Sequence, residues 1–80
     1  MDKSYHEKLN AICMLEWQQE KSVEALENVE KRLARVLANE IIGATEEAEN
    51  LRRALEAVRT AKRALNFSTN PMRHRLLGGK

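Results

Sequence analysis

Residues that break helices are scarce in this 80-residue chain, which has one proline and three glycines. The proline is Pro71, two of the glycines are Gly78 and Gly79, and the remaining glycine is Gly43. From the N-terminus to Ile42 the sequence therefore contains neither of the residues that most disfavour a helix interior. This absence predicts a long, unbroken helix before Gly43.

Cysteines and long apolar runs are scarce as well. Cys13 is the only cysteine, which excludes an intramolecular disulfide and is typical of a reducing compartment. No apolar run approaches the about 20 residues that span a bilayer. Residues 1–8 also lack the apolar centre of a signal peptide. We therefore expect a cytoplasmic protein that does not enter a membrane.

Aromatic side chains are limited to one phenylalanine, one tyrosine and one tryptophan, so any core must consist of Leu, Ile, Val and Ala. Ordering a chain costs about 1.5 kcal/mol of conformational free energy per residue. A chain this short buries little apolar area to offset that cost. We therefore expect a homo-oligomer, either a dimer or a larger assembly.

The segment from Ile41 to Glu47 predicts a turn between two helices. Gly43 can take the left-handed conformation that closes a helix, and Thr45 can cap the helix that follows. Glutamates then occupy the first turn of that helix, where the helix dipole favours negative charge. A stop signal followed so closely by a start signal indicates a tight helical hairpin.

The predicted fold is all-α: an antiparallel helical hairpin over residues 1–67 that assembles into a helical bundle oligomer. Its first helix is expected over about residues 5–42 and its second over about residues 46–66. Asn66–Pro71 ends the pattern, because polar residues and a proline cannot continue the helix. Residues 68–80 are expected to form a basic tail.

The first predicted helix starts with a capping-box sequence, Ser4-Tyr5-His6-Glu7. Its apolar residues recur at spacings of three, four and seven, which define one helical face. That stripe contains Leu9, Ile12, Leu15, Val23, Leu26, Val29, Leu33, Val36, Leu37 and Ile41. Gln19 and Ser22 occupy heptad positions where apolar residues belong. This gap indicates either a register-setting layer of a coiled coil or a bend near Gln18–Ser22.

The two predicted helices differ in length, so the second covers only about residues 22–42 of the first. The uncovered first half is the most apolar stretch of the chain, and its apolar side chains face two ways. Three of them continue the core stripe and three lie on the opposite side. We predict that these residues contact another copy or a partner protein: Leu9, Ile12, Cys13, Met14, Leu15 and Trp17.

Charge is divided unevenly along the chain. Residues 1–49 hold six Lys/Arg and eleven Asp/Glu, a net charge of 6 − 11 = −5, and residues 50–80 hold eight and one, a net charge of 8 − 1 = +7. One interpretation is an anion-binding surface for a nucleic acid or a nucleotide, using Arg52, Arg59, Lys62, Arg63, Arg73 and Arg75. The other is pairing of these residues with glutamates of the first helix, at positions 24, 27 and 30.

No constellation for catalysis is visible. His6 and Cys13 are seven residues apart on one helix, beyond the hydrogen-bond reach that nucleophilic catalysis requires. Two histidines and one cysteine do not supply the convergent ligands of a metal site. We therefore expect no enzyme, no cofactor and no metal.

The preferred interpretation is a small regulatory or adaptor protein that oligomerises and binds a macromolecule through the first half of its first helix. The alternative is an anion-binding module that uses the basic second half, and a purely structural spacer is third. The architecture is similar to that of small phage and plasmid hairpin regulators that form four-helix bundles. It is also similar to that of phage hairpin proteins that sequester signalling nucleotides.

Overall fold

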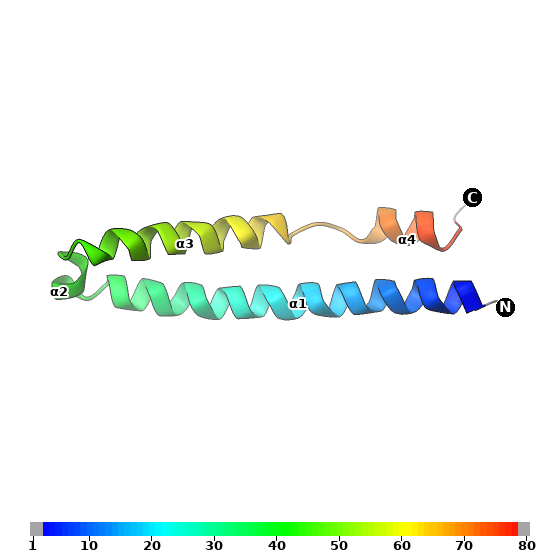
Figure 1. Ribbon diagram of the computed structural model, residues 1–80, viewed down its shortest axis with the longest axis horizontal. Helices are drawn as coiled ribbons and strands as arrows, with labels where there is room; N and C mark the ends of the chain where they lie inside the picture. Colours follow the sequence, from blue (N-terminus) through cyan, green and yellow to red (C-terminus); the bar gives the residue numbers. More distant parts are fainter. Residues whose placement is uncertain (1–2, 79–80) are drawn as a thin grey trace.

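The protein is described by a computed structural model, which covers residues 3–78. Four helices follow one another along the chain, and the described residues contain no strand. They are α1 (Lys3–Leu37), α2 (Glu40–Gly43), α3 (Glu47–Ala64) and α4 (Asn70–Leu76). Figure 1 shows a rod of two antiparallel rows, with α1 as one row, α3 and α4 as the other, and α2 at the turn. The Cα trace extends over 62 × 17 × 13 Å.

Helix α1 is a single helix of 35 residues, and it runs without interruption through Gln18–Ser22. The bend considered for that segment is therefore absent, as the lack of glycine and proline predicts. The expected bounds of 5–42 are wrong, because α1 already includes Lys3 and ends at Leu37. Since Ser4 lies inside the helix, it does not act as the residue that caps it.

The turn is larger than the tight hairpin that the sequence predicts. After α1 ends, Asn39 accepts hydrogen bonds through Oδ1 from the backbone amides of Ile41 and Ile42, at 3.0 and 3.1 Å. Asparagine is a preferred cap, because its side chain satisfies amides that the first helical turn leaves unpaired. Thr45 does not cap α3; its hydroxyl donates to the carbonyl of Ile42 at 2.6 Å. The single-turn helix α2 therefore lies between the two long helices.

Gly43 has a different role from the one predicted. It ends α2 without a positive φ, so it does not close a helix in the left-handed conformation. A Cβ at this position would instead lie 3.2 Å from the carbonyl oxygen of Leu37. The backbone of the turn thus passes close to the end of α1, and a residue without a side chain allows that approach.

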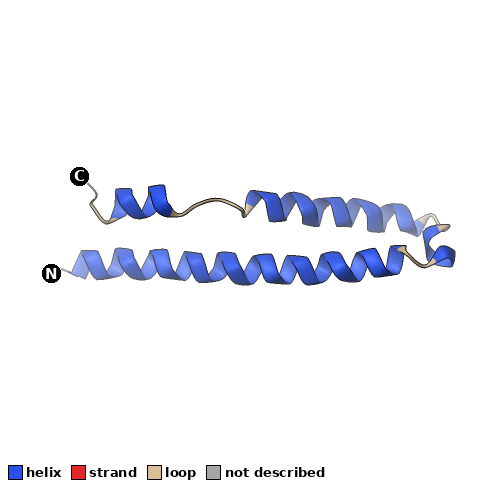
Figure 2. Cartoon of the chain, turned by 180° about the vertical axis from the view of Figure 1, so that it is seen from behind, coloured by secondary structure: helices blue, strands red, loops and turns tan. Residues whose placement is uncertain are grey.

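The predicted basic tail contains a further helix. Pro71 lies in the first turn of α4, where its missing amide costs nothing and its fixed φ suits a helix. The hydroxyl of Ser68 accepts a hydrogen bond from the amide of Asn70 at 3.1 Å. Residues 65–69 form the non-helical connector from α3 to α4 (Figure 2). Helix α4 packs against α1, so much of the segment assigned as a tail is ordered on the hairpin.

The core is thin, as expected for two rows of helices. Among the described residues, the buried apolar side chains are those of Ile12, Ala48 and Leu55, with exposed fractions of 0%, 0% and 8%. Most other members of the apolar stripes are half-buried, and Val29, Val36 and Ile41 are exposed, because each helix has a neighbour on one side alone. The hairpin thus leaves apolar surface open.

Candidate interaction surfaces

Half of the predicted contact residues lie beneath α4. Helix α3 ends near Gln19, and Ile12 is seven residues, or about 10 Å, further along α1. The element that packs against α1 there is α4, and Ile12 is fully buried. Leu9 and Leu15 are half-buried on either side of it. The prediction that this stripe has no partner within the chain is therefore wrong.

The other half of the predicted contact residues lie on the outer side of α1. Met14 is 63% exposed and Trp17 is 55% exposed, and Cys13 is also exposed. The ammonium of Lys21 lies 5.8 Å from the ring centroid of Trp17, within the range of a cation–π contact. We call Met14 and Trp17 the outer patch. Two large apolar side chains one helical turn apart form a small contact surface that the chain itself leaves uncovered.

Glu16 holds α4 against α1. Its carboxylate accepts two hydrogen bonds from Nη2 of Arg73, at 2.9 and 3.0 Å, and one from the hydroxyl of Thr69. The hydrogen bond from Thr69 and then those from Arg73 lower the pKa of Glu16 below its ordinary value. The same contact raises the pKa of Arg73. We call these three residues the Glu16 clasp, and they join α1 to both ends of the first turn of α4.

Gln19 explains the polar gap in the apolar stripe of α1. Its Nε2 donates to the carbonyl oxygen of Leu65 at 2.6 Å and to that of Phe67 at 3.0 Å. These carbonyls follow the end of α3, where helical partners are missing. Gln19 therefore satisfies the backbone at the point where α3 gives way to the connector. The sequence signal for this contact is that Gln19 interrupts the apolar stripe of α1 close to the level where the second helix is predicted to end.

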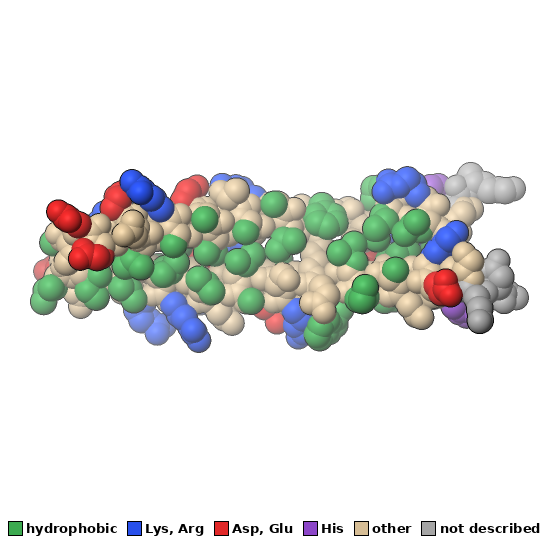
Figure 3. Space-filling view, in the orientation of Figure 1, with side chains coloured by type: hydrophobic (Ala, Val, Ile, Leu, Met, Phe, Trp, Pro, Cys, Tyr) green, Lys and Arg blue, Asp and Glu red, His purple; other side chains and the backbone are tan. Residues whose placement is uncertain are grey.

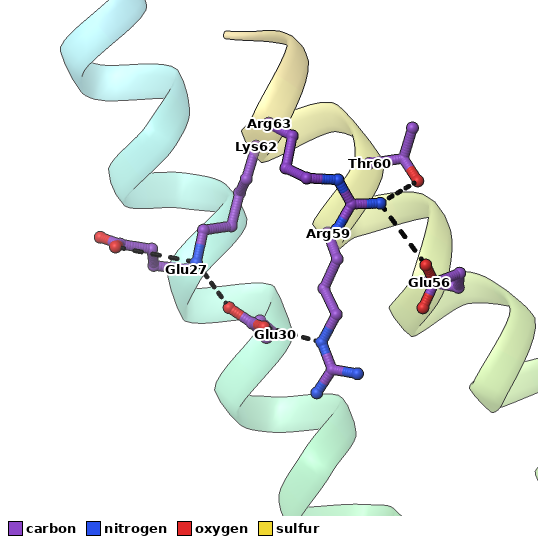
Figure 4. A network of polar contacts seen from close by, with 7 residues as sticks. All are labelled: Glu27, Glu30, Glu56, Arg59, Thr60, Lys62 and Arg63. Atoms are coloured by element: carbon purple, nitrogen blue, oxygen red, sulfur yellow. Dashed lines mark hydrogen bonds and ion pairs between the residues drawn. The ribbon is translucent and has the colours of Figure 1, made fainter. Parts of the chain in front are cut away.

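The basic residues of α3 pair mainly with glutamates (Figure 4). Glu30 accepts from Nζ of Lys62 at 2.7 Å and from Nε of Arg59 at 3.0 Å. These two hydrogen bonds, that from Lys62 first, lower the pKa of Glu30. Lys62 also lies 3.9 Å from Glu27. The interpretation that basic residues of the second half pair with glutamates 24, 27 and 30 thus describes Arg59 and Lys62 with Glu27 and Glu30. It does not describe Glu24, which pairs with Lys21 on its own helix at 3.6 Å.

The remaining candidates for anion binding have other partners or none. Arg63 lies 3.5 Å from Glu56 on its own helix, and it donates to the hydroxyl of Thr60 at 3.2 Å. Arg52 reaches Glu49 at 3.4 Å and the carbonyl oxygen of Gly43 at 3.1 Å. Arg73 belongs to the Glu16 clasp. Arg75 is exposed and has no ion-pair partner among residues 3–78. The structure therefore does not bring the six residues together as one cluster.

The ion pairs divide the hairpin into two long faces. Consecutive residues of a helix point about 100° apart, so Val29 and Glu30 lie on different sides of the line of contact with α3. Val58 and Arg59 are related in the same way on α3. Because Glu30 and Arg59 meet on one side, the two valines lie on the other.

We call that other side the apolar face. Its members lie at the heptad position of Val29 or of Val58, or one helical turn away from these valines on the same side of the helix. They are Ser22, Ala25, Val29, Val36, Leu51, Ala54, Val58, Ala61 and Leu65. Arg32 shares the heptad position of Ala25 and lies at the edge of this face, and the members named above are uncharged. The opposite side carries the pairs of Glu30. Figure 3 shows hydrophobic side chains along the junction of the two helical rows over the middle of one face.

The charged side also contains an open groove of about 660 Å³. Val23, Leu65 and Phe67 supply apolar surface to it, and Phe67 is 48% exposed. The other lining residues are polar or charged: Glu16, Gln19, Glu20, Glu24, Glu27, Lys62, Arg63 and Asn66. Because this groove is open to solvent, it can receive a side chain of another molecule more readily than enclose a small ligand.

The part of the chain that the structure describes contains neither a cluster of metal ligands nor a membrane-spanning helix. Within residues 3–78, no three His, Cys, Asp or Glu side chains lie close enough together to hold a metal ion. No helix among these residues is long and apolar enough to cross a membrane.

Comparisons of the chain with protein-family models, with curated proteins and with solved structures find no match.

Proposed function

We propose that this chain is a non-enzymatic interaction protein that works as a helical bundle of two or more copies and binds a further macromolecule. The observation that carries the proposal is the outer patch. Trp17 and Met14 remain 55% and 63% exposed although the chain has few large apolar residues to bury. Exposing such side chains to water costs free energy unless a partner covers them.

The chemistry of the outer patch supports a protein as the partner. Tryptophan is among the residues that contribute most to protein interfaces, because its large ring gives much contact area for little loss of entropy. Methionine adapts to irregular surfaces. Lys21, beside the ring of Trp17, adds a positive charge at the rim, where it can pair with an acidic group. The protein thus acts as an adaptor, an inhibitor or a regulatory subunit.

A paired substitution tests the proposal. The tagged protein is isolated from the cells that produce it, and proteins that remain bound are identified by mass spectrometry. Trp17→Ala is expected to weaken the binding of the specific partner by about 30-fold, since truncating a central tryptophan typically costs about 2 kcal/mol. The control is Asn28→Ala, which changes another exposed residue of α1 and removes no apolar contact.

Fluorescence gives an independent measurement, because Trp17 is the single tryptophan. Binding of the purified partner should shift its emission to shorter wavelength as the ring leaves water. Equal retention of every bound protein by the wild type and by Trp17→Ala would refute the proposal. So would emission of Trp17 that stays unchanged when the partner is bound.

A further inference from the structure

We infer that the apolar face is the contact surface for a second copy of this chain, and that two hairpins pack these faces together as a two-fold dimer. This inference rests on the self-association in the proposed function, and it assigns that association to one surface. The surface differs from residues 9–17, which the sequence indicates. It lies between Ser22 and Val36 on α1 and between Leu51 and Leu65 on α3.

The surface area of the monomer supports this assignment. The chain exposes 6337 Å² of accessible surface. A compact folded monomer of 9.2 kDa exposes about 4,900 Å² by the usual scaling with mass. The excess of about 1,400 Å² is more than the about 800 Å² that each partner buries in a standard protein interface. A second copy can therefore cover one face of the rod and leave the charged side in water.

The residues of the apolar face suit packing between identical helical hairpins. Val29 and Val36 are one heptad apart, as are Leu51 and Val58, and Leu65 follows one heptad later. This spacing keeps the apolar row on one side over the length of a helix that packs against another. Alanines at positions 54 and 61 lie between the larger side chains, so a second pair of helices can approach closely. The result is a four-helix bundle.

The face also lacks features that other occupants require. It has no tryptophan, tyrosine or phenylalanine, the residues on which recognition of an unrelated protein often depends. Its single basic residue, Arg32 at its edge, is too little charge to attract an anionic lipid surface. Because Arg32 lies at the edge and the rest of the face is uncharged, two copies of it can meet without like charges in the centre of the contact. A two-fold contact uses the same surface on both subunits, so the apolar side chains that one hairpin leaves exposed or half-buried pack against the equivalent surface of the other.

The test is mass in solution, measured by sedimentation equilibrium over a range of concentrations. The wild type is expected at twice the chain mass of 9.2 kDa. Val29→Glu should dissociate to 9.2 kDa, with the dimer dissociation constant raised at least about 100-fold, because a carboxylate would enter an apolar contact. Val29 is 39% exposed in the monomer, so the substitution leaves the hairpin helical by circular dichroism.

The matched control is Asn28→Glu, which places the same charge one residue away, on the outer side of α1. It should retain the wild-type mass. Trp17→Ala should retain it as well, so loss of the partner and loss of the dimer are separate outcomes. A wild type that is monomeric at every concentration would overturn the inference. A Val29→Glu variant with the wild-type mass, or binding of the wild-type face to lipid vesicles in place of a second copy, would also overturn it.

Discussion

The two halves of α1 are covered by helices of very different length. Its C-terminal half packs against α3, a helix of 18 residues, whereas its N-terminal half packs against α4, a helix of 7 residues. An isolated helix shorter than about 12–15 residues is marginal in water. The order of α4 therefore depends on its contact with α1, and the two ends of the rod should differ in local stability.

The means of attachment differ as well. Leu55 and Ala48 are buried along α3, and the ion pairs of Glu30 lie beside them at the surface. At the α4 end, Ile12 is the largest fully buried side chain, and polar contacts from Glu16 and Gln19 fix the connector and the helix. The C-terminal half of α1 is thus held by apolar packing over a long helix. The N-terminal half is held by one buried side chain and a small set of hydrogen bonds.

The largest expected effect comes from truncating one buried side chain in each half. Leu55→Ala should lower the free energy of unfolding by about 2–5 kcal/mol, since a large apolar side chain in the core is removed. Ile12→Ala removes a similar amount of buried surface, but it should act first on α4. Denaturant unfolding followed by circular dichroism measures the global effect, and amide hydrogen exchange measures the local one.

The two halves of the rod are distinguished by which backbone amides lose their protection from hydrogen exchange. In Ile12→Ala, the amides of α4 should exchange much faster while those of α3 remain protected. In Leu55→Ala, amides of α3 and of the facing half of α1 should lose protection together. If Ile12→Ala instead accelerates exchange over the entire rod to the same extent, the two halves unfold as one unit and the distinction between them is wrong.

A smaller effect is expected from acid at the Glu16 clasp. The pKa of Glu16 is lowered in the folded protein, so the clasp stabilises fully above the ordinary glutamate pKa of about 4.3. That contribution is lost as pH falls through the lower folded-state pKa, because the protonated carboxyl no longer pairs with Arg73. Exchange of the α4 amides, corrected for the intrinsic pH dependence, should therefore accelerate below about pH 4.

Glu16→Gln is the variant that isolates this group. It should release α4 at neutral pH and remove the further change in acid. The pKa of Glu30 is lowered as well, so Glu30→Gln serves as the matched control in the α3 half. Because α3 also has buried leucine and alanine side chains, Glu30→Gln should leave α3 protected. Equal protection of α4 in the wild type and in Glu16→Gln would show that the clasp does not hold it.

Much of the helical architecture could be predicted from the sequence, because the scarcity of glycine and proline and the 3.6-residue periodicity act locally. The position and continuity of the long helices follow from these patterns. The docking of α4 could not be predicted in this way. It depends on Glu16 meeting Thr69 and Arg73, which are more than 50 residues away in the chain. In the sequence, Glu16 resembles the other surface glutamates of α1.

The turn shows a second limit of sequence reasoning. Glycine after a long helix usually signals a left-handed closing residue, and the sequence predicts that role for Gly43. The capping function belongs to Asn39 instead, four residues earlier, and α2 occupies the space between. Both readings are consistent with the local sequence. Whether Gly43 closes a helix or Asn39 caps α2 depends on the direction that α3 needs in order to pack against α1. That direction is set by tertiary contacts.

The smallest effect is expected from Gly43→Ala, which tests whether the turn acts on one half alone. Alanine favours a helix over glycine by about 1 kcal/mol. The new Cβ would lie 3.2 Å from the carbonyl oxygen of Leu37, a backbone atom that moves only with the turn. The two effects oppose each other, and the net loss of stability should stay below about 1 kcal/mol. Because α2 joins α1 to α3, exchange should change at the start of α3 and not in α4. A gain of about 1 kcal/mol would show that the turn does not pass this close to α1 in solution.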